Sequence, residues 1–223
     1  MRNLKDRLYT VQTLVPKGSR VADIGTDHGH LPISLVKAEI SPFVIAADIG
    51  VKPLSVAKQN IEKCGLKNIE TRLSDGLEAI KPDEVDCVTI AGMGGEVIEG
   101  ILERCPWIKN ARYTLILQPM TGADTLRRYL VLNGFETVEE KAVLDAGKLY
   151  CVIKAKFSGN VLPQSEAFYR VGKLDPKKPT DKAYIEKQLK IATKCKLDLE
   201  NSGRDFESYQ KLCLELNLIL GEN

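Results

Sequence analysis

The sequence predicts an α/β fold in which helices cover a mostly parallel sheet of seven strands. Short apolar runs alternate with amphipathic segments over residues 1–158, the pattern of repeated βαβ units. A glycine-containing turn joins the first apolar run to the next amphipathic segment, as in nucleotide-binding sheets. Only Asp145–Lys148 separates the last two apolar runs, and this loop is too short for a helix. We therefore expect these runs to form an antiparallel hairpin at the edge of the sheet.

The spacing of apolar residues defines the expected elements. A first helix is expected from Asn3 to Val15, with Leu4, Leu8 and Val11 on one face. Strands are expected near residues 20–24, 43–48, 69–73, 87–91, 113–118, 136–144 and 149–157. A parallel sheet that ends in an antiparallel hairpin is the arrangement of class I, Rossmann-like methyltransferases, whereas a dinucleotide-dependent dehydrogenase more often continues with parallel units. The predicted antiparallel hairpin at the end of the sheet therefore favours S-adenosyl-L-methionine (AdoMet) over NAD as the ligand.

A second, helical region is expected after residue 158. Residues 159–180 contain three prolines and are expected to be irregular. Two amphipathic helices should follow, the first from Thr180 or Asp181 with Thr180 as its N-cap, and Asn201–Gly203 should form the turn between them. The apolar stripes are Ile185, Leu189, Ala192, Lys196 and Leu199 in the first helix, and Phe206, Tyr209, Cys213, Leu216 and Leu220 in the second. We expect two domains, an AdoMet-binding methyltransferase domain at 1–158 and an antiparallel, coiled-coil-like helical hairpin at 159–223.

Composition and charge limit the class of protein. Of the 223 residues, 43% are hydrophobic and 28% are charged, as in a soluble globular protein. No apolar run approaches the roughly 18 residues of a membrane span, and the N-terminus lacks the apolar core of a signal peptide, so a cytoplasmic protein is expected. The six cysteines are spread singly and both histidines lie in the glycine turn, so neither a metal site nor a disulfide framework is expected. The net charge of +2 is too small to indicate nucleic-acid binding by itself.

The turn within Val21–Pro32 carries the first candidate ligand-binding residues. The candidates for binding a cofactor are Asp23, Gly25, Thr26 and Gly29. The two glycines have no Cβ, so the backbone can approach a ligand closely. A dinucleotide-binding turn has glycine where this chain has Asp27, and the carboxylate would repel a pyrophosphate. The same carboxylate favours a cationic ligand such as AdoMet, and His28 beside it is either a substrate contact or a donor at the helix start.

Four more candidate positions follow the second to fifth strands, whose carboxyl ends share one edge of the sheet. They are Asp48 with Ile49, Asp75 with Gly76, Ala91 with Gly92 and Met93, and Gln118 with Pro119. Asp48 is placed to accept hydrogen bonds from ribose hydroxyls, unless it only caps its strand. Asp75 is placed to accept a hydrogen bond from an adenine amino group, although Ser74–Gly76 also fits a simple helix entry. The glycine-rich stretch 92–95 should let the backbone approach the ligand, with a plain turn as the alternative.

Charge is distributed unevenly in the helical region. Residues 170–196 contain nine basic side chains against three acidic ones, whereas residues 198–222 contain six acidic and two basic. The first of these segments either binds phosphates or only keeps an exposed helix face in solution. The residues expected to contact nucleic-acid phosphates are Arg170, Lys173, Lys187, Lys190 and Lys194.

Several of these motifs together resemble one family of bacterial enzymes. The motifs are Asp23–Pro32, Ala47–Ile49, Ser74–Leu77, Ala91–Gly95 and Leu117–Pro119. Along its whole length the chain is similar to the TrmK family of tRNA adenine-N1 methyltransferases, which act at position 22 in the D-arm region. The resemblance implies AdoMet as the methyl donor, tRNA as the partner and a C-terminal helical coiled-coil extension. The Asn-Pro-Pro-aromatic motif of methyltransferases that act on exocyclic amino groups is absent after the fourth strand, which fits a ring-nitrogen target.

The implied reaction assigns candidate catalytic roles to Asp27 and His28. Adenine N1 has its own lone pair, so methyl transfer needs alignment more than a strong base, and the base must be unstacked to expose its Watson–Crick edge. Methylation leaves positive charge on the ring, which the Asp27 carboxylate would stabilise.

Two other classes remain open at this stage. One is a methyltransferase for a small molecule or protein that dimerises through the helical hairpin, and the other is a non-catalytic module that binds AdoMet or a nucleotide. The sequence leaves the oligomeric state open and favours a monomer, and no membrane or metal partner is expected.

Overall fold

The computed structural model describes residues 6–221, which fold around one seven-stranded sheet. The strands are β1 Val21–Ile24, β2 Val44–Asp48, β3 Ile69–Leu73, β4 Cys87–Met93, β5 Thr114–Pro119, β6 Phe135–Asp145 and β7 Lys148–Phe157. Their order across the sheet is β3-β2-β1-β4-β5-β7-β6. The first five strands are parallel, and β7 is antiparallel to both β5 and β6. The predicted seven-stranded sheet with an antiparallel edge hairpin is confirmed.

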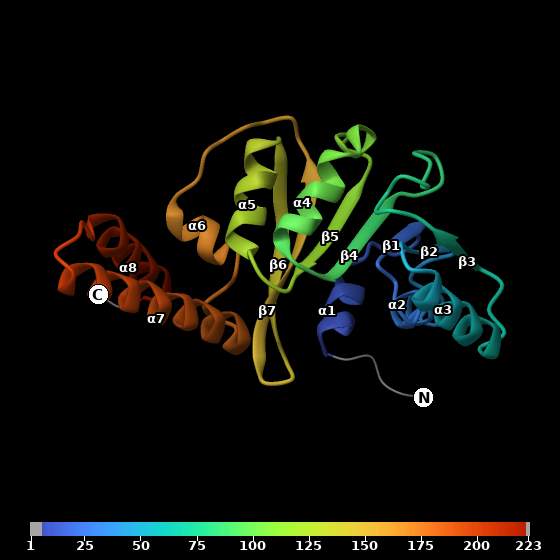
Figure 1. Cartoon of the computed structure of the whole chain (residues 1–223), viewed down its shortest axis with the longest axis horizontal. Coiled ribbons are helices and arrows are strands. Elements are labelled where there is room, and N and C mark those ends of the chain that lie inside the picture. The colour runs from blue at the N-terminus through green and yellow to red at the C-terminus, as the bar shows by residue number, and fades with distance from the viewer. Residues whose placement is uncertain (1–5, 222–223) are drawn as a thin grey trace.

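Helices cover both faces of the sheet (Figure 1). The helices on one face are α1 Asp6–Leu14, α2 His30–Lys37 and α3 Val51–Lys63, and those on the other are α4 Gly95–Glu103, the short 3-10 helix Pro106–Ile108 and α5 Ala123–Leu132. Alternate residues of each central strand enter the two cores, so that Val21 packs with α1 and α2 while Ala22 packs with α4 and α5. Strands buried on both faces explain why the sequence shows continuous apolar runs rather than alternation. The first helix was expected from Asn3, and its first three residues lie outside the described residues.

The chain order places a ligand-binding crevice at the carboxyl ends of β1 and β4. From β1 the chain moves outward to β2 and β3, and it then returns to β4 on the other side of β1. The connections after β1 and β4 therefore leave toward opposite faces of the sheet. In open α/β sheets the crevice between two such strands is where ligands bind. The candidate residues that follow β1 to β5 all lie along this edge of the sheet.

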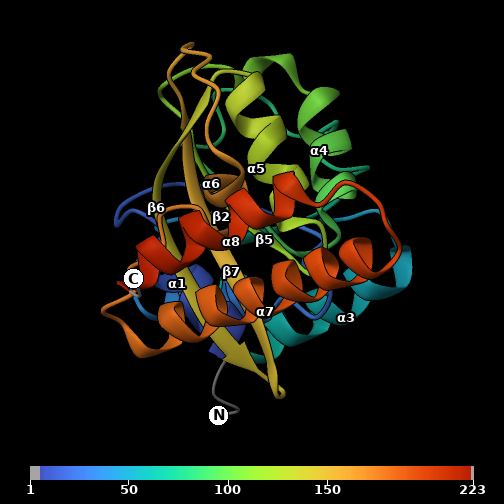
Figure 2. The same cartoon turned by 90° about the vertical axis from the view of Figure 1, so that its left-hand side faces the viewer.

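The C-terminal region contains three helices, α6 Glu166–Val171, α7 Pro179–Asn201 and α8 Glu207–Leu220. Helices α7 and α8 lie side by side and antiparallel, as predicted (Figure 2). The expectation that residues 159–180 are irregular is wrong for α6, which begins where Ser165 Oγ accepts a hydrogen bond from the Phe168 N–H at 3.2 Å. The expected N-cap at Thr180 is also wrong, because α7 begins at Pro179, whose fixed φ suits the first helical position.

A buried ion pair anchors the C-terminal region to the sheet. The Arg127 guanidinium of α5 is fully buried, lies 2.9 Å from Glu140 Oε2 of β6, and also donates to the carbonyl oxygens of Tyr169 and Arg170 at 3.0 Å each. Nearby, the Asp181 carboxylate of α7 accepts the N–H of Ala142 at 2.8 Å. Removing one partner of a buried pair costs about 3–5 kcal/mol, so these contacts hold the helices in place. Among the helices within residues 6–221, none has the length and apolarity to span a membrane.

Candidate functional site

The turn after β1 is shaped by left-handed backbone conformations. Gly25, Asp27 and Gly29 have φ angles of 74°, 51° and 71°. A Cβ on Gly25 would lie 2.2 Å from the Cε atom of Met93, so the Met93 side chain occupies the space that any larger residue would need. A Cβ on Gly29 would lie 3.3 Å from the Ala57 Cβ of α3. The two glycines therefore serve close packing of the turn against β4 and α3.

Asp23 lies beneath this turn rather than at its surface. Its side chain is 4% exposed, and Thr89 Oγ1 donates a hydrogen bond to Asp23 Oδ1 at 2.7 Å. Burial raises the pKa of the Asp23 carboxyl to about 6, because desolvation outweighs the hydrogen bond from Thr89. A cationic group bound above the turn would stabilise the ionised carboxylate. A buried carboxyl in this position can influence a ligand only through its charge and not by direct contact.

Asp48 joins the ends of β2 and β1. Its Oδ1 accepts the Gly50 N–H at 2.8 Å, and its Oδ2 accepts the Asp27 N–H at 3.2 Å. It therefore caps the strand end, one of the two expected roles. Each carboxylate oxygen has a further lone pair, so Asp48 can also accept ribose hydroxyls. Next to it, Ile49 is 68% exposed and Val51 is 71% exposed, which gives the crevice an apolar wall.

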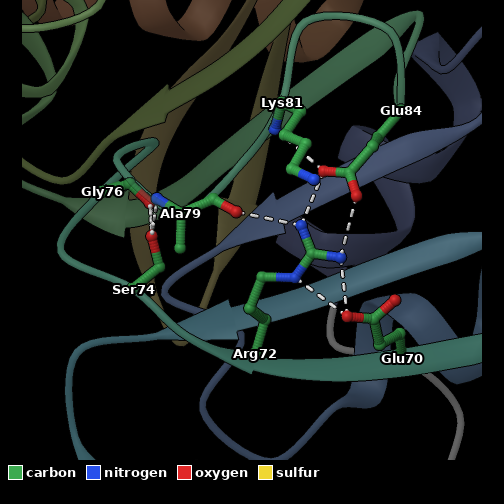
Figure 3. A network of polar contacts seen from close by, with 7 residues as sticks. All are labelled: Glu70, Arg72, Ser74, Gly76, Ala79, Lys81 and Glu84. Atoms are coloured by element: carbon green, nitrogen blue, oxygen red, sulfur yellow. Dashed lines mark hydrogen bonds and ion pairs between the residues drawn. The ribbon is translucent and has the colours of Figure 1, made fainter.

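An arginine network fixes the loop that follows β3 (Figure 3). Arg72 lies 2.6 Å from both Glu70 Oε1 and Glu84 Oε2, and its Nη1 donates to the Ala79 carbonyl oxygen at 2.9 Å. The Ser74 Oγ donates to the Gly76 carbonyl oxygen at 2.8 Å and accepts the Ala79 N–H at 3.1 Å. Turns follow Ser74 instead of a helix, so the alternative of a simple helix entry is wrong.

Asp75 projects from this fixed loop. Its carboxylate lies 3.0 Å from Nη2 of Arg104, the C-cap of α4, at the edge of a cavity of about 280 Å³ that Trp107 and Leu77 also line. Both Asp75 and Arg104 are about half exposed. Arg104 binds Oδ1, so Asp75 can still accept a hydrogen bond from a ligand on Oδ2. Gly76 serves packing, because a Cβ there would lie 2.9 Å from Ile101 of α4.

The glycine-rich stretch 92–95 is not the loop expected from sequence. Strand β4 continues to Met93, and its register against β5 shifts between Ala91 and Met93, so Gly92 forms a bulge with φ 85°. Met93 then accepts the Met120 N–H at 2.7 Å through its carbonyl oxygen, and Gly94 is the N-cap of α4. The stretch is therefore held rigidly at the carboxyl edge of the sheet.

Gln118 and Pro119 are buried at the end of β5. Gln118 Nε2 donates to the Pro119 carbonyl oxygen at 2.8 Å, and Gln118 Oε1 accepts the Gly92 N–H at 3.1 Å. The structure thus places the Gln118 side chain among protein partners, where it supports the bulge from inside.

The candidate catalytic pair lies at the surface. Asp27 Oδ2 is 3.5 Å from His28 Nε2, and the two side chains are 67% and 48% exposed. The His28 ring lies against the ring of His30, with 5.6 Å between their centroids. In the described part of the chain no cluster of three or more His, Cys, Asp and Glu residues is arranged to hold a metal ion.

The five basic candidates of the helical region differ in whether an acidic side chain lies next to them. Arg170 and Lys187 line a cavity of about 160 Å³ between α7 and the segment Pro119–Asp124. Arg170 Nη1 also lies 2.9 Å from Asp124 Oδ2, and Lys173 lies 3.5 Å from Glu136. The exposed side chains of Lys187, Lys190 and Lys194 repeat at helical spacing on α7, and within residues 6–221 they have no ion-pair partner.

One residue of this edge escaped the sequence interpretation. Arg7 of α1 donates from Nη1 to Gln118 Oε1, and its Nε lies 3.5 Å from Asp145 Oδ2 in the hairpin between β6 and β7. It looked like an ordinary exposed residue of an amphipathic helix. Gln118 is 111 positions away in the sequence, so no local sequence pattern predicts this contact.

Comparisons with known proteins follow the same lines. Residues 4–153 match the family described as a methyltransferase domain. The tRNA (adenine(22)-N(1))-methyltransferase of Bacillus subtilis (strain 168) is 40% identical over 154 residues, which are 69% of this chain and 65% of that protein. The crystal structure of B. subtilis TrmK superposes with a TM-score of 0.80 at 31% identity, covering 99% of this chain and 97% of that chain. M. capricolum TrmK, in complex with S-adenosyl-homocysteine, superposes with a TM-score of 0.78 at 28% identity, covering 97% of this chain and 99% of that chain.

The fold and its carboxyl-edge site define a class I methyltransferase. Within that class, the chain belongs to the TrmK family. The residues present also fit a sulfonium-containing nucleoside. Asp48 has free lone pairs for hydroxyl groups, Ile49 gives an exposed apolar surface for a planar base, and the carboxylates of Asp23 and Asp27 favour positive charge.

Proposed function

We propose that this protein transfers a methyl group from AdoMet to N1 of the adenosine at position 22 of tRNA. The observation that supports this most directly is the position of the cavity lined by Arg170 and Lys187. Its wall at Met120 is hydrogen-bonded to Met93, so the basic cavity lies directly beside the glycine-rich end of β4. A nucleic acid bound to α7 would reach the edge of the sheet where the methyl donor is expected.

On the donor side, each candidate residue has a defined task. Asp48 accepts the ribose hydroxyls, and Ile49 packs against the adenine ring. Gly25 keeps the turn close to the ligand, and Asp75 accepts the adenine amino group on Oδ2 while Arg104 holds Oδ1. When bound, AdoMet supplies an electrophilic methyl group. Asp27 argues against NAD as the ligand, because its carboxylate lies where a dinucleotide-binding turn has a glycine next to the pyrophosphate.

On the acceptor side, the basic residues bind the tRNA backbone. Lys187, Lys190 and Lys194 contact phosphates along one face of α7, and Arg170 and Lys173 extend this surface toward the sheet. Arg170 and Lys173 are paired with Asp124 and Glu136, so their share in binding is smaller than that of the three lysines. The partner is tRNA, and the protein acts in the cytoplasm as a monomer.

The chemistry requires positioning more than proton transfer. Adenine N1 carries its own lone pair and needs alignment and desolvation once the base is unstacked. The Asp27 carboxylate offsets the positive charge that develops on the ring, and His28 contacts the base. Both side chains are exposed in the free protein, as residues that meet an incoming base must be.

The test is a methylation assay with labelled AdoMet and an unmodified tRNA transcript, followed by mapping of the methylated nucleoside. We expect 1-methyladenosine at position 22. The matched control is the same transcript with guanosine at position 22, which should stay unlabelled. Label at another position would contradict the assigned target, and AdoMet binding without label in any tRNA would contradict the enzymatic role.

A further inference from the structure

Arg7 connects three parts of the chain that meet at the carboxyl edge of the sheet. Its guanidinium donates to Gln118 Oε1 at the end of β5 and faces Asp145 of the hairpin between β6 and β7. A Cβ placed on Gly92 would lie 3.4 Å from Arg7 Nη1 and 3.7 Å from Nη2, so the guanidinium lies against the bulge in β4. The side chains of Arg7 and Asp145 are only 15% and 17% exposed, which is low for a charged pair at the edge of a sheet.

The bulge leaves the N–H of Gly92 without a partner in the sheet, and Gln118 supplies the acceptor. Gly92 stands outside the pairing of β4 with β5, so its N–H has no acceptor in the ladder. Gln118 Oε1 accepts that N–H at 3.1 Å and accepts the Arg7 Nη1 donor with its second lone pair. Because the charged donor fixes the carbonyl of the Gln118 amide, Arg7 also fixes the N–H of Gly92.

The bulge in turn positions Met93. The Met93 side chain lies over Gly25 of the first turn, where a Cβ would meet its Cε at 2.2 Å. A shift of the bulge would therefore move Met93 across the crevice between β1 and β4. The Arg7 cation itself is unfavourable beside a reaction that leaves positive charge on the acceptor base, and the Asp145 carboxylate offsets it.

We infer that Arg7 is a positioning residue for methyl transfer, which acts through Gln118 and Gly92 to hold Met93 and the end of β4 in the reactive arrangement. The inference rests on the proposed methyl transfer. It assigns to α1 a role in the chemistry that is distinct from its packing on the sheet through Val11 and Leu14.

The test compares Arg7→Met, which removes the guanidinium donors but keeps an unbranched apolar stem, with Arg7→Lys, which keeps the positive charge on a single terminal nitrogen. We expect Arg7→Met to lower kcat by roughly 10- to 100-fold, the scale of a small misplacement of reacting groups. AdoMet affinity and tRNA affinity should stay near the wild-type values, and kcat is compared at a temperature at which all variants remain folded, because Asp145 loses its partner in Arg7→Met. Arg7→Lys should recover part of kcat, because an ammonium group cannot reproduce the fork of the guanidinium.

Arg20→Met is the matched control. Arg20 pairs with Asp86 at 3.1 Å beside the opposite, amino-terminal ends of β1 and β4. This variant removes an arginine–aspartate pair at the edge of the sheet away from the ligand site, and it should leave kcat unchanged.

A second measurement does not depend on any methyl acceptor. Hydrogen exchange of the Gly92 amide should be faster in Arg7→Met than in the wild type, and unchanged in Arg20→Met. Unchanged exchange at Gly92, or a loss of activity that only follows a loss of folded protein, overturns the inference. Failure of the wild type to methylate tRNA would instead contradict the proposed function, and the exchange result would still stand.

Discussion

The carboxyl edge of the sheet and the basic face of α7 hold their polar side chains in opposite ways. At the edge, Asp48 and Gln118 each bind backbone groups of two elements. On α7, Lys187 and Lys190 are exposed and lack an ion-pair partner in the described part of the chain. Fixed groups suit a small ligand whose atoms must be aligned, whereas long, mobile side chains suit phosphates along a flexible backbone. The first region therefore holds its polar groups in fixed positions, and the second presents exposed positive charge.

The largest effect should come from the geometry of the first region. Gly25→Ala forces a left-handed φ on alanine and displaces the end of the Met93 side chain from the turn, so we expect AdoMet affinity to fall on the order of 100-fold, measured by calorimetry. Gly18→Ala is the control, because Gly18 has a similar φ of 86° but nothing within 4 Å of its Cβ. Equal losses in the two variants would show that backbone strain alone is responsible.

Removing charge from the second region should have an intermediate effect confined to tRNA. We expect the triple variant with Lys187, Lys190 and Lys194 changed to Gln to bind tRNA roughly 10- to 100-fold more weakly at low salt, with a salt dependence whose slope is lower by about 2. AdoMet affinity should not change. Binding is measured by filter retention across a salt series.

The control for this variant removes three exposed lysines from the other end of the molecule. The triple change of Lys58, Lys63 and Lys67 to Gln alters the net charge equally. An equal loss of tRNA affinity in both triple variants would contradict a binding face on α7 and indicate a general effect of charge.

The last effect concerns Asp23, depends on pH, and is on the stability of the free protein rather than on ligand binding. Its folded-state pKa of about 6 lies above the ordinary value of 3.8, so the folded protein favours the neutral acid. Stability is therefore lost as pH rises from about 4 to 6, by at most about 3 kcal/mol for a shift of about 2 units. We expect Asp23→Asn to be more stable than the wild type at pH 7.5 and equally stable near pH 4, by urea unfolding of the free protein. A variant that is less stable at both pH values would show that the carboxylate has an essential partner.

Local patterns in the sequence were sufficient for the sheet and for the residues at its edge. Apolar runs, the glycine turn after Asp23 and the short loop at Asp145–Lys148 correctly predicted a mostly parallel seven-stranded sheet and its antiparallel edge hairpin. Elements supported by distant contacts were not predictable. Helix α6 is short and is stabilised by burial of Ala167 and Tyr169 in the tertiary structure, and the bulge at Gly92 depends on Gln118.

The site shows the same division. The position of Asp48 at a strand end was predictable, because the chain itself places it there. Three other features could not be predicted, because each depends on which elements pack together. They are the burial of Asp23, the pairing of Asp75 with Arg104, and the contact of Arg7 with Gln118. Side chains that a motif places can be predicted from sequence, whereas their partners cannot.

The buried Arg127 restricts how the two regions can be recombined. Its guanidinium donates both to Glu140 of the sheet and to two carbonyl oxygens of α6, so neither side is complete alone. A chimera joined at residue 158 would bring a foreign α6 to this guanidinium, and it would fold only if that segment presented its carbonyl oxygens at the same place. The C-terminal region is therefore tied to the sheet by backbone contacts and is not an independently exchangeable module.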